Sequence, residues 1–124
     1  MSESLKNTLT FSDAIRVTKP LRFNMMFKPV GSKCNLACDY CYYLDKVKQY
    51  GTQSVMSLNL LEKVIEDYIA VNDNEQIVFD WHGGEPLLLG LDYFKKIVEL
   101  QKKYRGNKCV YNTIQTNGTL LNDD

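Results

Sequence analysis

Apolar residues recur every three to four positions in two stretches of this chain. The first stretch runs from Leu58 to Val71 and follows Ser57, a good N-cap residue. The second begins near Leu91 and ends before Gly106, a residue type that often terminates helices. Each stretch predicts an amphipathic helix with one face packed on a sheet. The residues expected on the buried faces are Leu58, Leu61, Ile65, Tyr68 and Ile69 in the first helix, and Leu91, Phe94, Ile97, Val98 and Tyr104 in the second.

Three shorter apolar segments predict strands. Arg22 to Lys28 is bounded by prolines on both sides. Ile77 to Trp81 is short and β-branched at its start, as expected for a strand buried on both faces. Cys109 to Thr116 runs into Asn117-Gly118, a common turn dipeptide. Strands that alternate with helices in this way predict right-handed crossovers and an α/β fold with a parallel sheet.

The polar and glycine-rich residues near these strands follow their carboxyl ends, where α/β folds place their sites. Residues 1–20 are polar without a clear period, which predicts an N-terminal extension that is disordered or forms an edge element. Residues 21–124 would then form the folded domain. At its far end, Asn122-Asp123-Asp124 resembles the N-cap and acidic first turn of another helix. We therefore expect this chain to be the beginning of a longer protein.

Composition narrows the class of protein. The chain has 124 residues and is 44% hydrophobic, enough for one small globular domain. The chain has 15 lysine and arginine residues and 15 aspartate and glutamate residues. It therefore carries no net charge that would attract nucleic acid. No apolar run reaches the ~18 residues of a membrane helix, and the N-terminus lacks the apolar core of a secretion signal. We therefore expect a cytoplasmic protein with reduced thiols.

Three cysteines stand close together at Cys34, Cys38 and Cys41. One loop with this spacing can present three thiolates to a small metal centre. A [4Fe-4S] cluster usually takes four cysteines, so a cluster held by three would keep one iron open for chemistry. Zinc is the main alternative, with Cys109 or His82 as a fourth ligand. A disulfide is less consistent with a reducing compartment. Three buried core cysteines are less consistent with the polar residues between and beside them.

The cysteine motif and two later segments resemble a known family. Cys34-x-x-x-Cys38-x-Tyr40-Cys41, followed by Gly83-Gly84-Glu85-Pro86, resembles the radical S-adenosylmethionine superfamily. The segments 81–88 and 115–121 resemble, more closely, the anaerobic sulfatase-maturating enzymes. The resemblance begins near Phe27 and implies the N-terminal part of a parallel (βα)6-type partial TIM barrel, about three strands with covering helices. In that family a cysteine-rich C-terminal domain with auxiliary [4Fe-4S] clusters follows, and it would be absent here.

The resemblance also implies roles for single residues. The three cysteines would bind a [4Fe-4S] cluster whose fourth iron is chelated by S-adenosyl-L-methionine. Contacts with that cofactor fall on Tyr40, Gly83, Gly84, Glu85, Pro86, Gln115 and Asn117. Tyr40 would stack beside the adenine, the two glycines would let the backbone approach the methionine, and Glu85 would meet its amino group. Tyr43 would face the substrate peptide.

Several of these residues also have ordinary structural interpretations. Tyr40 and Tyr43 could be packed aromatic residues, Gln115 a capping residue and Asn117 part of a turn. A hydrogen-bonded structural imidazole is the preferred interpretation of His82 over a catalytic base. Cys109 is expected to be a small core residue.

The reaction implied by the resemblance is oxidation of a cysteine or serine of a sulfatase to Cα-formylglycine through a 5′-deoxyadenosyl radical. A reducing electron donor such as flavodoxin or ferredoxin would be a partner, and the cell would be anaerobic or microaerobic. The general base would lie beyond Asp124, so the 124 residues alone are expected to have little activity. Another peptide modification, forming a thioether or a cross-link, and a non-catalytic zinc or iron-sulfur binding module stay open as alternatives.

Overall fold

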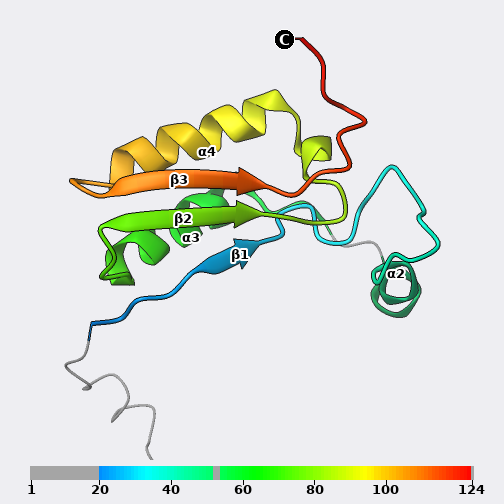
Figure 1. Ribbon diagram of the computed structural model, residues 1–124, viewed down its shortest axis with the longest axis horizontal. Coiled ribbons are helices and arrows are strands. Elements are labelled where there is room, and N and C mark those ends of the chain that lie inside the picture. The colour runs from blue at the N-terminus through cyan, green and yellow to red at the C-terminus, as the bar shows by residue number, and fades with distance from the viewer. Residues whose placement is uncertain (1–19, 52–53, 124) are drawn as a thin grey trace, which may run out of the picture.

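The computed structural model describes residues 20–51 and 54–123. The N-terminal extension predicted for residues 1–20 therefore lies, apart from its last residue, outside the described part. Three strands and two long helices alternate along the chain, and a short helix, α2, lies beyond the strand ends (Figure 1). The elements are β1 (Met25–Phe27), α2 (Leu44–Tyr50), α3 (Leu58–Val71), β2 (Gln76–Trp81), the 3-10 helix η1 (Pro86–Leu89), α4 (Leu91–Tyr104) and β3 (Cys109–Ile114).

The strands form one parallel sheet in the order β1-β2-β3. Met26 is level with Asp80, which is level with Thr113. The predicted α/β class with a parallel sheet is therefore confirmed. Two strands are shorter than expected: β1 has three residues, and β3 ends at Ile114. The sequence patterns did not predict α2 or η1.

Helix α3 begins and ends where the pattern predicts. The Ser57 hydroxyl oxygen accepts a hydrogen bond from the backbone N–H of Leu60 at 3.3 Å, which satisfies one of the free donors of the first turn. Four of the five residues expected to face the sheet are buried: Leu61, Ile65, Tyr68 and Ile69. Leu58 is 48% exposed, so its predicted burial is wrong. It lies in the first turn, where the described residues do not cover it.

Helix α4 also has its predicted extent, and Gly106 follows with a positive φ of 56°. Its buried residues are Ile97, Leu100 and Gln101, whereas Leu91 and Val98 are exposed against prediction. Polar pairing across the interface accounts for the burial of Gln101. The Gln101 amide exchanges hydrogen bonds of 2.7 and 2.8 Å with the amide of Asn112 on β3. Because both amides have hydrogen-bond partners, Gln101 rather than Val98 can face the sheet.

Aromatic rings fill the space between the sheet and helix α3. Phe27 stacks on Phe79 with centroids 5.3 Å apart, and Phe79 on Trp81 at 5.7 Å. Tyr68 meets Phe79 edge to face and donates its hydroxyl to the Val78 carbonyl at 2.9 Å. Alternate residues of β2 are buried and half-buried. The prediction that β2 is buried on both faces is thus wrong for the described residues, because both covering helices pack on one face.

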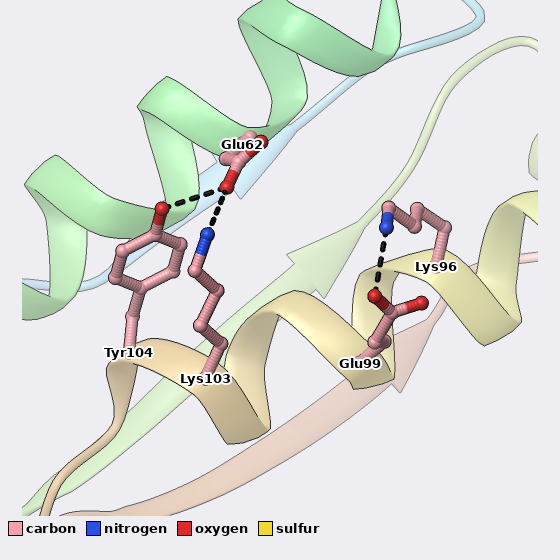
Figure 2. Close-up of polar contacts among 5 residues, drawn as sticks. All are labelled: Glu62, Lys96, Glu99, Lys103 and Tyr104. Carbon is pink, nitrogen blue, oxygen red and sulfur yellow. Dashed lines mark hydrogen bonds and ion pairs between the residues drawn. The ribbon is translucent and has the colours of Figure 1, made fainter.

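Side chains of α3 and α4 also meet at the surface, as Figure 2 shows. Glu62 accepts hydrogen bonds from Lys103 Nζ and Tyr104 Oη, each at 2.7 Å. Lys96 and Glu99 pair at 2.8 Å along α4. Hydrogen bonds from Lys103 and Tyr104 lower the pKa of the Glu62 carboxyl. These contacts align the two helices outside the core.

Two further expectations concern the chain as a whole. None of the helices in the described ranges is long and apolar enough to span a membrane. Residues 122 and 123 adopt no regular structure, and Asp124 lies outside the described residues, so the predicted start of another helix stays a prediction.

Candidate functional site

Three loops meet beyond the carboxyl ends of the three strands (Figure 1). The first, residues 28–43, follows β1 and carries the cysteines; we call it the cysteine loop. The second, residues 82–85, follows β2, and the third, residues 115–121, follows β3. The backbone N–H of Gly84 donates to the Gly31 carbonyl at 2.8 Å, and that of Glu85 donates to the Lys33 carbonyl at 2.8 Å. The sheet topology therefore brings all three predicted motifs together.

The two glycines allow this close approach of backbones. A Cβ added to Gly83 would lie 2.4 Å from Cγ1 of Val30, and one added to Gly84 would lie 1.8 Å from the Lys33 carbonyl oxygen. Any side chain at Gly84 would therefore separate the second loop from the cysteine loop. We expected the glycines to admit a bound methionine. The structure adds a second requirement for them, the contact between loops, while the approach to a cofactor stays a prediction.

Glu85 is a buried carboxylate that joins the second and third loops. Its Oε1 accepts hydrogen bonds from Thr116 Oγ1 at 2.7 Å and from the N–H of Leu87 at 2.9 Å, and its Oε2 accepts one from the N–H of Asn117 at 2.8 Å. Burial alone would raise the pKa of Glu85, but these three donors outweigh it and hold the pKa below its ordinary value. The carboxylate is thus ionised and fully engaged within the protein.

The third loop in turn reaches the cysteine loop. Asn117 Nδ2 donates to Asn35 Oδ1 at 3.0 Å and lies 3.9 Å from Sγ of Cys34. Asn35 Nδ2 donates to the Thr119 hydroxyl at 2.9 Å. The residue roles assigned from the sequence missed Asn35, Thr116 and Thr119. Their type and position could have indicated this role. They are short polar side chains near Cys34 or Gly118, and such side chains often form hydrogen bonds with nearby backbone.

The three predicted metal ligands share the cysteine loop and are accessible. Cys34 is exposed, Cys38 and Cys41 are half-buried, and all are free thiols. The Cys41 N–H donates to the Cys38 carbonyl at 2.8 Å, which forms the turn that leads into α2. Within the described residues, no three side chains of His, Cys, Asp or Glu are gathered closely enough to form a metal site. The donor set nevertheless fits an iron-sulfur cluster, because three accessible thiols stand on one anchored loop.

The fourth cysteine lies at the wrong end of the sheet for this site. Cys109 is level with Gln76 at the amino ends of the strands, and it is exposed. The prediction that it is a core residue is wrong, because β3 is one of the two edge strands among the described residues. Its position also excludes it as the fourth ligand of a zinc site with the other cysteines. His82 is half-buried at the carboxyl end of β2, where its backbone N–H donates to the Phe27 carbonyl at 2.8 Å, and the predicted structural role of its imidazole stays a prediction.

The other predicted site residues surround the same loops. Tyr40 is 91% exposed, and a hydrogen bond with the Cys38 side chain raises the pKa of its hydroxyl. Tyr43 is half-buried with Lys28 Nζ 4.2 Å from its ring centroid. Gln115 extends the sheet through a 2.9 Å hydrogen bond from its N–H to the Trp81 carbonyl, and its side chain is exposed. Pro86 is buried and begins η1.

The chain is similar to known proteins in sequence and fold. Residues 29–124 match the model of the radical SAM superfamily. The chain is 53% identical over 108 residues to a serine-type anaerobic sulfatase-maturating enzyme of Bacteroides thetaiotaomicron, covering 86% of this chain and 26% of that protein. It is 42% identical over 108 residues to a cysteine-type anaerobic sulfatase-maturating enzyme of Clostridium novyi, covering 82% of this chain and 28% of that protein.

A solved structure agrees with these sequence matches. The structure of native anSMEcpe with bound AdoMet and Kp18Cys peptide superimposes with a TM-score of 0.72 at 37% identity, over 84% of this chain and 27% of that one. The chain thus spans about a quarter of the length of the relatives that it matches. The superfamily match covers most of the chain, and the three motifs that define the site fall within it. This chain belongs to the radical SAM superfamily.

Proposed function

We propose that this chain forms the cofactor-binding part of a radical S-adenosylmethionine enzyme that oxidises a cysteine or serine of a sulfatase to Cα-formylglycine. The observation that carries the proposal is the joining of the cysteine loop to the two loops after β2 and β3 by direct hydrogen bonds. The identity to sulfatase-maturating enzymes supports the choice of substrate.

In this proposal, Cys34, Cys38 and Cys41 bind a [4Fe-4S] cluster, and the loop after β2 binds S-adenosyl-L-methionine. When bound there, the two cofactors would supply the radical chemistry needed to remove a hydrogen atom from the substrate. The protein's own residues position them. Gly83 and Gly84 keep the second loop against the cysteine loop, and the exposed face of Tyr40 is available for the adenine.

Further residues complete the proposed site. Glu85 and Pro86 shape the loop that faces the methionine, Gln115 and Asn117 line the cofactor side of the third loop, and Tyr43 faces the peptide. The partners would be the sulfatase polypeptide and a reducing electron donor such as flavodoxin or ferredoxin. Four free cysteines suit a reducing compartment such as the cytoplasm. The domain that binds auxiliary clusters and the general base would be supplied by sequence beyond these 124 residues.

The test is anaerobic reconstitution with iron and sulfide, followed by metal analysis and electron paramagnetic resonance with and without S-adenosylmethionine. We expect about four irons per chain for this cluster type and a reduced-cluster signal that S-adenosylmethionine alters. Cys34→Ser should abolish that change, whereas Cys109→Ser, at the opposite end of the sheet, should retain it. One zinc per chain, no iron-sulfide absorbance and no response to S-adenosylmethionine would instead identify a zinc module.

The substrate is tested separately. Peptides from a sulfatase should be converted to the formylglycine product, detected by mass spectrometry, only when this chain is part of the longer protein. A thioether or carbon cross-link as product would identify a different peptide modification. Turnover by the 124 residues alone would contradict the proposed need for the remaining sequence.

A further inference from the structure

One side chain reaches a cysteine sulfur from a different strand. Asn117 follows β3, and its Nδ2 lies 3.9 Å from Sγ of Cys34, 83 residues earlier in the chain. The backbone N–H of Leu36 approaches the same sulfur at 3.4 Å. Two N–H groups therefore point at Cys34, one supplied by the cysteine loop itself and one by the third loop.

The orientation of the Asn117 amide is fixed by its other neighbours. Its Oδ1 accepts hydrogen bonds from the backbone N–H of Thr119 at 3.0 Å and from the Thr119 hydroxyl at 2.8 Å. A backbone N–H can only donate, so the amide oxygen must face Thr119. The NH2 group must then face Cys34 and Asn35, whose Oδ1 accepts from it at 3.0 Å. The donor character toward the sulfur thus follows from the hydrogen-bond network.

The backbone of Asn117 is held just as firmly. Its N–H donates to Oε2 of the buried Glu85 at 2.8 Å, and Oε1 of Glu85 binds the Thr116 hydroxyl. The N–H of Glu85 donates to the Lys33 carbonyl, one residue before Cys34. A closed chain of contacts therefore runs from the cysteine loop through Glu85 and Asn117 and back to Cys34.

We propose that Asn117 is a positioning residue that donates a hydrogen bond to the Cys34 thiolate of the cluster and raises the reduction potential of that cluster. Hydrogen bonds to sulfur are one of the terms that set iron-sulfur potentials. The reduced cluster carries one more negative charge than the oxidised cluster, so an N–H dipole aimed at a ligand sulfur stabilises the reduced form more. The inference rests on the proposed function, because it assumes that Cys34 binds the cluster.

The decisive variant is Asn117→Asp, measured in the anaerobically reconstituted protein. Aspartate keeps the shape and the oxygen that Thr119 binds, but it replaces the N–H donor with a negatively charged oxygen. The midpoint potential of the cluster, measured by redox titration with paramagnetic resonance detection, should become more negative. At a fixed potential near the wild-type midpoint, the ratio of reduced to oxidised cluster should fall about tenfold, which corresponds to 59 mV for one electron.

Two further variants separate hydrogen bonding from charge and from folding. Asn117→Ala removes the donor without adding charge, and a smaller shift in the same direction is expected. Asn107→Asp adds the same charge in the exposed turn before β3, at the amino end of the sheet, and should leave the potential unchanged. Asn107→Asp should also take up as much iron as the wild type, because it lies at the opposite end of the sheet. Iron content is measured in both Asn117 variants, so that potentials are compared for the cluster-containing protein.

The possible results are distinguishable from failure of the proposed function. A wild-type protein that takes up no cluster would overturn the proposed function and this inference together. A wild-type cluster that responds to S-adenosylmethionine, with the same midpoint potential in Asn117→Asp and Asn117→Ala, would overturn only the role of Asn117. An equal shift in Asn107→Asp would show that overall charge, rather than the hydrogen bond, controls the potential.

Discussion

The two ends of the sheet are both held by hydrogen bonds, but these bonds join different kinds of partner. At the amino end, Lys108 Nζ donates to the carbonyls of Ile69 and Asn72, which close the last turn of α3. Asn72 Nδ2 donates to the Phe23 carbonyl at 2.6 Å. These contacts satisfy carbonyl groups at the end of α3 and add a second donor, beside Tyr68, to the Phe23 carbonyl just before β1.

At the carboxyl end, most of these bonds join loops to one another, although Glu85 also caps the start of η1. Glu85 is buried, yet the residues that it positions include the exposed Asn117 beside the exposed Cys34. This end therefore combines a rigid inner layer with accessible outer side chains. The difference predicts that substitutions that break the inner layer at the carboxyl end lower both stability and iron uptake, whereas those at the amino end alter stability alone.

The largest effect is expected for Gly84→Ala. Its Cβ would lie 1.8 Å from the Lys33 carbonyl oxygen, so the backbones of two loops must separate and lose the hydrogen bonds between them. We expect a loss of about 3 kcal/mol in the free energy of unfolding, measured by urea titration, together with loss of iron uptake. Gly106→Ala is the control, since it has a positive φ of 56° but no atom within 4 Å of the added Cβ. It should cost about 1 kcal/mol and leave iron uptake intact. Equal losses in both variants would contradict the contact argument.

Glu85→Gln should have the next largest effect. The glutamine amide has the size of the carboxylate, but its NH2 group would face one of the three groups that donate hydrogen bonds to Glu85. We expect a loss of about 2 kcal/mol at neutral pH, because a buried donor is left without an acceptor.

The pH dependence of stability tests the same carboxylate. The pKa of Glu85 is lowered in the folded protein, so its stabilisation is complete above the ordinary value of about 4.3 and is lost as the pH falls through the lower folded pKa. The difference in unfolding free energy between wild type and Glu85→Gln should therefore shrink in acid. A difference that stays constant from neutral pH down to pH 3 would show that the three hydrogen bonds do not require the charge.

Lys108→Met tests the amino end. It removes two hydrogen bonds to carbonyls at the end of α3, which can partly be replaced by water because the site is only half-buried. We expect a loss of about 1 kcal/mol in unfolding free energy. Iron uptake and the paramagnetic signal should match those of the wild type. A changed signal would contradict the prediction that the amino end affects stability alone.

The same division explains what could be predicted from the sequence. Helix α3 was predictable at both bounds, because its cap and its period depend on neighbours within one or two turns. The exposure of Leu58 was not predictable, because burial depends on whether an element distant in sequence covers that turn. The cysteine spacing predicts a set of ligands for the same local reason, and that assignment stays a prediction.

The network around Glu85 lay beyond such reasoning. Glu85 and Asn117 are 32 residues apart, and their contact exists only because Trp81 of β2 is level with Ile114 of β3. A shift of register by one residue would separate them. The hydrophobic pattern restricts the register, but it does not show which loop side chains then meet beyond the strand ends. The candidate site was thus predictable as a set of motifs, whereas the bonds that connect them required the sheet.

The smallest effect is expected for Glu62→Gln, in the surface cluster of Figure 2. Glu62 accepts from Lys103 and Tyr104 at 2.7 Å, but Lys103 is exposed and the other two residues are only half-buried, so water and ions compete with the contacts. The melting temperature should therefore change less than in Lys108→Met, and the remaining difference should vanish in 1 M salt. A larger loss than in Lys108→Met, persisting in salt, would mean that packing of α3 on α4 depends on this cluster. Stability would then be set at the helix surface as well as at the two ends of the sheet.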